Sequence, residues 1–224
     1  MYQDEKHSAL QHVSLKAGLK VPEHPLGLVV VAVGKDCPGM KVQNLHLSRM
    51  LSQHHIASLF AYLLDSKEEQ EYDNPFDIEL MSSRLVKITN WALGQPGLQG
   101  LPAGYFAVNV AAASALKASI TEGERIKAIV CRCGRTDLVK YELPLIKPAL
   151  LLISASEDIY INQLNKLAYE LLTCEKEIVM LDGAMDSFEE ADKARTIAQL
   201  ATDWFEKHLT GTVHMQDPEY TPMV

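Results

Sequence analysis

Residues 104–116 read Gly-Tyr-Phe-Ala-Val-Asn-Val-Ala-Ala-Ala-Ser-Ala-Leu. The stretch opens with aromatic and β-branched residues typical of a strand, and after Asn109 it continues as a run of small residues that predicts a helix. Small side chains at Ala107 and Ala111 let the strand and helix backbones approach closely on either side of a sharp turn. Asn tolerates a positive φ better than most non-glycine residues. We therefore expect a tight strand–turn–helix unit with Asn109 at its apex.

Strand-like segments recur on both sides of this turn. Residues 27–33 form an unbroken apolar run of strand length, as expected for a strand covered on both faces. Further strands are predicted at 56–63, 104–108, 126–131, 149–153 and 177–181, and helices at 43–54, 77–93, 110–120, 160–173 and 187–208. This alternation predicts an α/β fold, a doubly wound and mostly parallel sheet with helices on both faces. Residues 12–21, with Gly18 at the turn, predict a short antiparallel hairpin at one edge.

The chain is expected to form a single domain over residues 1–209, followed by a C-terminal tail at 210–224. A length of 224 residues is ordinary for one α/β domain. The tail has two prolines and little hydrophobic periodicity. The acidic stretch 65–77 is interpreted as a solvated connection, with a lid or a partner-docking loop as the alternative.

Charge and composition argue against several classes of partner. The net charge is −8 and the pI is about 5.5, and the sequence has no basic cluster for nucleic acid or for an anionic membrane surface. The longest apolar run is far shorter than the roughly 20 residues of a membrane span. The N-terminus lacks a signal-peptide pattern, and the four cysteines match no zinc signature. These features predict a cytoplasmic protein with reduced cysteines and no bound metal or cofactor.

Several motifs, in order, resemble the dienelactone-hydrolase-like branch of the α/β-hydrolases. They are the strand 27–33 with its following loop, the segment 104–116, and the stretches 132–138, 151–158, 183–188 and 203–205. The resemblance covers about residues 27–209. It implies the α/β-hydrolase fold, in which a serine nucleophile sits on a strained strand-to-helix turn called the nucleophile elbow.

The resemblance also implies a triad in the chain order serine, acid, histidine. Carried over position by position, the acid is Asp158, but the nucleophile position holds Asn109 and the histidine position holds Asp186. An amide nitrogen is a poor nucleophile, and a carboxylate cannot replace histidine as the base near pH 7. The sequence has no histidine between His55 and His208, so shifting the alignment near Asp186 does not restore the base.

We therefore expect a hydrolase fold without hydrolase chemistry, which binds a small ligand or acts as a scaffold. The backbone N–H of Val110 and one from Gly34 or Lys35 would form an oxyanion hole, which does not depend on the missing side chains. Its ligand would be a small carboxylate or carbonyl compound. The scaffold alternative implies a homodimer or a protein partner, with the pocket filled by Met40, Met185 and Phe188.

The main alternative is a hydrolase of ester or lactone bonds that uses another nucleophile, such as a cysteine. Cys133 stands where relatives commonly carry glycine, and Cys37 follows the first long strand, so both are candidate reactive thiols. The spacing of two residues predicts that Cys131 and Cys133 share a sheet face. Two carboxylates, Asp158 and Asp186, are too few to argue for a cation site.

Two further features are interpreted as structural. His54 and His55 are adjacent and therefore lack the i,i+4 spacing of a helical metal site, which favours surface histidines. Ser114 lies more than one turn inside the predicted helix, where a small packing residue is expected.

Overall fold

The computed structural model describes residues 8–10, 13–15, 17–34, 40–65, 67–70, 76–183 and 190–210, with backbone alone for 8–17 and 40–42. The strands are β1 (Ser8–Leu10), β2 (Val13–Leu15), β3 (Ala17–Lys20), β4 (Gly27–Val33), β5 (Ile56–Tyr62), β6 (Ala103–Val108), β7 (Ile126–Arg132), β8 (Ala149–Ala155) and β9 (Lys176–Leu181). The α-helices are α1 (Met40–Gln53), α2 (Ile78–Leu93), α3 (Val110–Glu122), α4 (Ile159–Leu171) and α5 (Ala191–Leu209). Short 3-10 helices are η1 (Glu68–Gln70), η3 (Gly123–Arg125), η4 (Thr136–Val139) and η5 (Leu143–Leu145).

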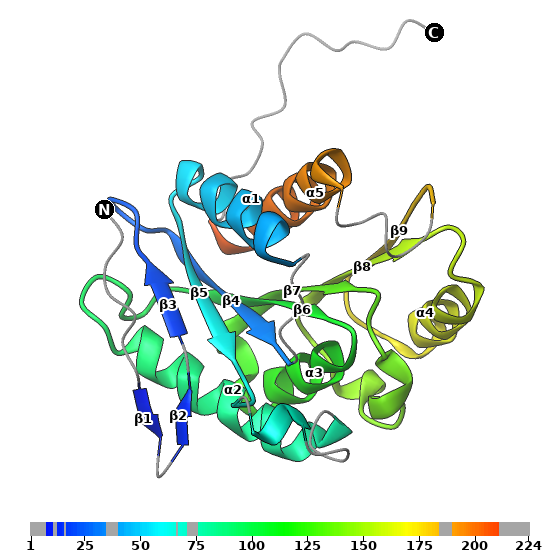
Figure 1. The fold of residues 1–224 in the computed structure, drawn as a ribbon, viewed down its shortest axis with the longest axis horizontal. Coiled ribbons are helices and arrows are strands. Elements are labelled where there is room, and N and C mark those ends of the chain that lie inside the picture. Colours follow the sequence, from blue (N-terminus) through cyan, green and yellow to red (C-terminus); the bar gives the residue numbers. More distant parts are fainter. Residues whose placement is uncertain are drawn as a thin grey trace, which may run out of the picture.

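Seven strands form one sheet in the order β3-β5-β4-β6-β7-β8-β9. Only β3 runs antiparallel to its neighbour, and every other pairing is parallel. Helices α1 and α5 cover one face, and α2 and α3 cover the other (Figure 1). The predicted doubly wound, mostly parallel α/β fold is confirmed.

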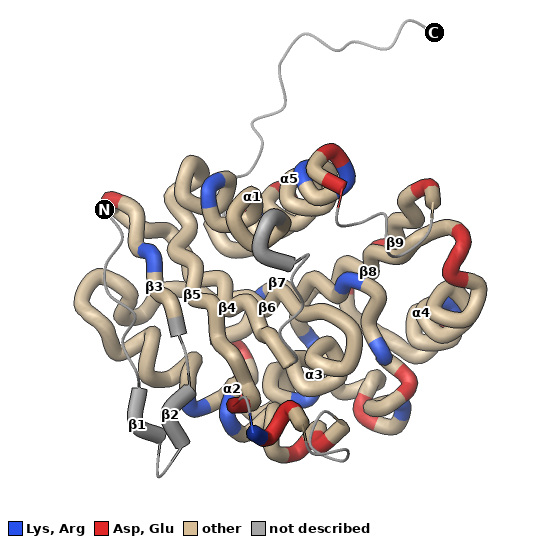
Figure 2. The backbone as a smooth tube through the Cα atoms, viewed as in Figure 1, with Lys and Arg blue, Asp and Glu red and all other residues tan. Residues whose placement is uncertain are grey.

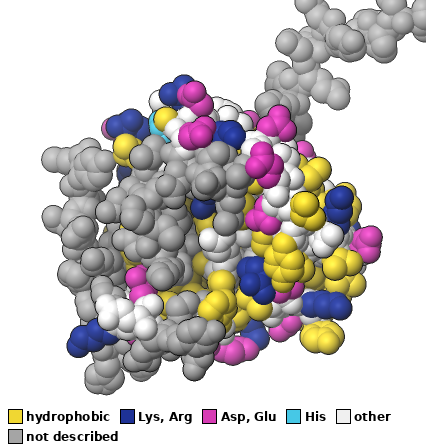
Figure 3. Space-filling model, turned by 45° about the vertical axis from the view of Figure 1, so that its right-hand side comes forward, with side chains coloured by type: hydrophobic (Ala, Val, Ile, Leu, Met, Phe, Trp, Pro, Cys, Tyr) yellow, Lys and Arg dark blue, Asp and Glu magenta, His cyan; other side chains and the backbone are white. Residues whose placement is uncertain are grey.

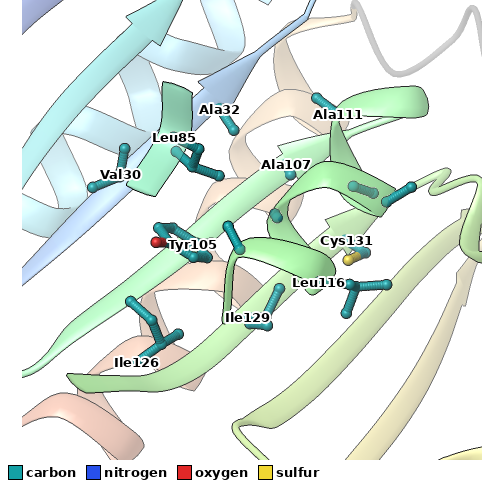
Figure 4. Close-up of a cluster of buried hydrophobic side chains, with 14 of the residues drawn as sticks. Val30, Ala32, Leu85, Tyr105, Ala107, Ala111, Leu116, Ile126, Ile129 and Cys131 are labelled. Carbon is teal, nitrogen blue, oxygen red and sulfur yellow. The ribbon is translucent and has the colours of Figure 1, made fainter. Parts of the chain in front are cut away.

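The sheet is buried from both sides because alternate residues of each strand enter two separate cores. All seven residues of β4 are buried. Leu28, Val30 and Ala32 join the core under α2 and α3, whereas Val29, Val31 and Val33 join the core under α1 and α5. Figure 4 shows part of the first core, where side chains of β6 and β7 meet those of α3.

The prediction for the N-terminal edge was wrong in detail. Gly18 lies inside β3, opposite Phe60 of β5, and not at a turn. The antiparallel hairpin is formed earlier, by β1 and β2, in a separate two-stranded sheet. Glycine marks turns only as a tendency, and here it occupies an edge strand, where an added Cβ would meet no atom within 4 Å.

The beginning of the acidic stretch, around Asp65 and Glu68, is attached to the protein by hydrogen bonds and an ion pair. The Glu68 carboxylate receives two hydrogen bonds of 2.7 Å from the Arg84 guanidinium of α2. Arg84 also donates to the Leu63 carbonyl at 2.7 Å, and Asp65 accepts from the Lys67 and Glu68 backbone N–H groups. This charged pair is mostly buried, with 10% and 21% of the Arg84 and Glu68 side chains exposed. Residue 66 and residues 71–75 lie outside the described part of the chain.

Acidic and basic residues are interspersed over the elements drawn in Figure 2, without a continuous basic strip. Within the described part of the chain, no helix combines the length and the apolar character needed to cross a membrane.

Candidate functional site

The candidate site lies at the carboxyl edge of the sheet, where β4 and β6 end. Strands β5 and β6 lie on opposite sides of β4. The connection from β4 leads to one side of β4, and the connection from β5 to β6 leads back across to the other side. Such a switch point leaves a crevice outside the strand ends, and ligands of open α/β sheets bind there. Gly34 follows β4 at this edge, and Asn109 follows β6.

Asn109 forms the sharp turn that the sequence predicts. Its φ is 51° and its ψ is −123°, a combination that costs most L-residues of order 1–3 kcal/mol. Its N–H donates to the Arg132 carbonyl at 3.2 Å, and its own carbonyl accepts from Ala112 and Arg135 at 3.2 and 3.1 Å. These backbone bonds hold the turn in place while the side chain stays exposed and makes no capping hydrogen bond to α3.

The turn is tight because small residues flank it. Ala107 and Ala111 are both buried, and the close-up of the core shows them where β6 passes into α3 (Figure 4). On the far side of α3, a Cβ added to Gly134 would lie 2.8 Å from the Ala112 Cβ. Small residues at these positions thus let α3 begin directly against the strand ends.

The first turn of α3 directs backbone N–H groups toward this edge. The N–H groups of Val110 and Ala111 have no acceptor within the helix, as at every helix N-terminus. Gly34 lies beside Ala111, because a Cβ on Gly34 would be 3.5 Å from the Ala111 Cβ and 4.0 Å from the Ala111 nitrogen. Free N–H groups combined with the helix dipole favour an anion or a carbonyl oxygen.

Asp158 follows β8 and begins α4. Its carboxylate accepts a hydrogen bond from the Ile161 N–H at 3.1 Å, so this side chain serves as the N-cap of α4, a structural role that sequence reasoning did not assign to it. An aspartate three residues before an apolar helical residue is an N-cap signal, and that signal was available here.

Cys133 follows β7 and links the end of this strand to β8. Its backbone N–H donates to the Ile153 carbonyl at 2.7 Å, its thiol interacts with the Ala155 backbone and lies within electrostatic range of Asp158, and its φ is 48°. A positive φ is the conformation that glycine adopts freely, in keeping with the glycine that the family resemblance implies here. Burial raises the pKa of the Cys133 thiol, because the charged thiolate is poorly solvated there.

The prediction that Cys131 and Cys133 share a face was wrong. Cys131 belongs to the core under α2 and α3, whereas Cys133 belongs to the core under α1 and α5. The strand ends at Arg132, and the positive φ of Cys133 turns the chain, so the two-residue alternation stops there. Full burial raises the pKa of Cys131 to about 12.

Two arginines near the turn were not singled out from the sequence. Arg132 is buried at the end of β7, and its carbonyl holds the Asn109 N–H. Arg135 donates its backbone N–H to Asn109, and its guanidinium forms two hydrogen bonds of 2.7–2.8 Å with Asp137 and lies over the Tyr160 ring. The 132–138 motif contains both arginines, but only the fold shows that they adjoin Asn109.

Other predicted site residues lie outside the described part of the chain. These are Lys35, Cys37, Asp186, Met185, Phe188 and the tail beyond Thr210, and the side chain of Met40 belongs with them. Ser114 is fully buried in α3, as expected of a packing residue. His54 pairs with Glu206 at 3.0 Å and His55 binds the Glu23 carbonyl at 2.9 Å, so the two rings have separate partners.

Comparison with solved structures places this geometry among known folds. A dienelactone hydrolase from Anabaena variabilis is 33% identical to the chain, with a TM-score of 0.81 over 93% of this chain and 97% of that one. DcsB, solved with its substrate analogue, gives a TM-score of 0.76 at 9% identity over 94% of this chain and 100% of that one. Est1E from Butyrivibrio proteoclasticus gives 0.70 at 10% identity over 92% and 98%. At such low identities, the last two likenesses concern the fold alone.

The curated sequences that match the chain are named for another activity and are longer than the chain. Proteins from two strains of Mycobacterium tuberculosis are 35% identical to the chain over 199 residues, and their names assign them provisionally to the phosphoribosyl transferases. The match covers 89% of this chain and 45% of each relative, so the chain spans about half the length of the curated relatives it matches. No protein-family model matches the chain.

Proposed function

The chain belongs to the dienelactone hydrolase family of α/β-hydrolase-fold proteins, and we propose that it binds a small carboxylate or carbonyl compound but does not hydrolyse it. The observation that carries the proposal is Asn109, an amide at the apex of a turn with a φ of 51°. The turn keeps the backbone shape of a nucleophile elbow, but an amide does not supply the nucleophile.

The family resemblance places Asp158 at the acid position and Asp186 at the histidine position. Without a serine and a histidine, no group takes a proton from a nucleophile and returns it to the leaving group. Loss of such a triad typically lowers kcat by about 10⁴- to 10⁶-fold. Ordinary serine-hydrolase turnover is therefore not expected.

The binding apparatus is made of backbone and does not need those side chains. The N–H groups of Val110 and Ala111, with Gly34 beside Ala111, would form a cradle for an oxygen that carries negative charge. We expect the ligand's carboxylate or carbonyl oxygen to occupy this cradle, with Lys35 as a further candidate contact.

Calorimetry with a panel of small carboxylates and carbonyl compounds tests the binding. A Gly34→Val variant would place methyl groups beside the first turn of α3, near the Ala111 Cβ and the Met81 sulfur. It should weaken binding at least about tenfold, as expected when a ligand clashes with its site, and circular dichroism must show that it still folds. Gly18→Val is the matched control, because Gly18 lies on the far edge strand with open space around it. No heat from any compound, or equal weakening by both variants, would reject the proposal.

A second assay tests the missing chemistry with activated aryl esters and lactones. The parent chain should be inactive, and Asn109→Ser/Asp186→His should gain turnover if the pocket and oxyanion hole are intact. Asn109→Ala/Asp186→His is the control, because it supplies the histidine without a nucleophile. Turnover by the parent chain that survives Asn109→Ala would instead favour the alternative hydrolase, and Cys133→Ala would then test the thiol as its nucleophile.

The mycobacterial relatives favour a second candidate, a scaffold role. In those proteins the matched region is 45% of a longer chain whose name concerns phosphoribosyl transfer. A phosphoribosyl transferase is the class of protein partner that this arrangement suggests for the chain. Co-purification of the chain with a phosphoribosyl transferase from the organism that encodes the chain would support the scaffold role. Elution of the two proteins in separate fractions would oppose it.

A further inference from the structure

Strand β9 ends the sheet with one side unpaired by any strand in the described part of the chain. The carbonyls of Glu175 and Leu181 accept hydrogen bonds of 2.8 Å from Leu150 and Ser156, so they face β8. Backbone groups alternate sides along a strand. Ile178 and Met180 therefore direct their N–H and C=O groups away from the sheet.

The side chains along this edge are unusually apolar for an unpaired strand. Met180 is 52% exposed and Ile178 is half-buried on the same face. Lys176, also on this face, lies over the ring of Tyr169 of α4, which is 37% exposed. Figure 3 shows hydrophobic side chains gathered on this side of the molecule, interspersed with charged ones. Edge strands that stay single commonly carry proline or several charges, whereas β9 has no proline and has its charges, Lys176 and Glu177, at one end.

The sequence of β9 is complementary to itself in one antiparallel register. If two copies pair around a two-fold axis at Val179, Ile178 lies opposite Met180 of the other copy, and Lys176 lies opposite Asp182. Moving the axis to Ile178 would place Lys176 opposite Met180, and moving it to Met180 would place Ile178 opposite Asp182. Opposite charges across a strand pair stabilise it, so the register at Val179 is favoured.

The Asp182 carbonyl already accepts a hydrogen bond from the Lys193 ammonium, so the contact with Lys176 of the other copy would come from the Asp182 carboxylate. The Lys176 ammonium donates to the carbonyls of Tyr169 and Leu172 at 2.6 Å, which leaves one of its three protons for a carboxylate. In the register at Val179, the outward-facing residues 178 and 180 oppose each other, and the two symmetric pairs form about four backbone hydrogen bonds.

We propose that the chain forms a homodimer in which β9 pairs antiparallel with β9 of a second copy, around a two-fold axis at Val179. The two sheets would continue into one, and Met180 and Ile178 would be covered. This interface lies at the sheet edge and does not depend on the ligand proposed above.

Light scattering coupled to size exclusion tests the dimer. The chain should show twice its 24.9 kDa mass at about 0.1 mM, where even a dimer with a Kd near 1 µM is mostly assembled. Met180→Pro removes an outward N–H without breaking the pairing with β8, so it should weaken the dimer at least tenfold. Met180→Thr keeps the N–H and is the matched control. A monomeric parent chain, or a dimer that Met180→Pro leaves unchanged, would overturn the proposal.

Cysteine cross-linking tests the register. In the proposed pairing Val179 faces its own copy, so Val179→Cys should give a covalent dimer on mild oxidation. In Glu177→Cys the two sulfurs would be about 13 Å apart along the strands, too far for a disulfide. Efficient cross-linking of Glu177→Cys and none of Val179→Cys would reject this register. Circular dichroism of each variant checks that it folds.

Discussion

Gly104 offers a sharp test of how closely β6 packs against the last helix. A Cβ added there would lie 2.7 and 2.9 Å from two carbons of the Phe205 ring and 2.8 Å from the Ala128 carbonyl oxygen. Real Cβ atoms do not approach other atoms this closely, so something must move. Phe205 is fully buried, and the Ala128 carbonyl belongs to the neighbouring strand, so neither can withdraw easily.

We expect Gly104→Ala to lower the free energy of unfolding by about 3 kcal/mol, at the upper end of the usual overpacking cost. Urea denaturation followed by circular dichroism measures this change through the midpoint at an unchanged slope. Gly18→Ala is the control, because its Cβ would meet no atom within 4 Å. We expect it to stay within about 1 kcal/mol of the parent chain.

A double-mutant cycle separates the two contacts. Phe205→Leu alone should cost about 1–2 kcal/mol through lost packing. Combined with Gly104→Ala, it should cost about 1 kcal/mol less than the sum, because the smaller side chain gives the new Cβ room. A Gly104→Ala variant within about 0.5 kcal/mol of the parent, or strict additivity in the cycle, would refute this account of the packing.

Three more predictions concern the site and its surroundings. Glu68→Gln should destabilise the chain by about 1–3 kcal/mol, because Arg84 stays buried without its carboxylate. The Arg84 hydrogen bonds hold the pKa of Glu68 below its ordinary 4.5. The stability that the Glu68 carboxylate contributes is therefore full above pH 4.5 and is lost as the pH falls through the lower pKa of the folded state. Between pH 7 and pH 3, the free energy of unfolding measured with urea should fall more in the parent chain than in Glu68→Gln. Asn109→Gly should raise the free energy of unfolding by about 1 kcal/mol by relieving a strained backbone, and an equal or lower thermal midpoint would argue against strain. Cys131 and Cys133, buried with raised pKa values, should react with a thiol reagent only after unfolding, and rapid labelling of Cys133 in the native protein, identified by mass spectrometry, would contradict this.

The sequence determined the main architecture because its signals are local. The unbroken apolar run of β4 predicts a strand covered on both faces, and the small residues around Asn109 predict a tight turn into a helix. Both are present, with β4 buried throughout and Asn109 at a φ of 51°. Hydrophobic periodicity and residue size act over a few residues, so these features could be derived without knowing the neighbours.

The tertiary structure decided the features that depend on residues far apart in the chain. The sequence of the acidic stretch does not show that Glu68 pairs with Arg84, 16 residues later on another element. The opposite faces of Cys131 and Cys133 follow from where β7 stops pairing, and the place of Gly18 follows from its pairing with Phe60 of β5. Charge pairing, strand ends and edge register are set by long-range contacts, which only the folded chain defines.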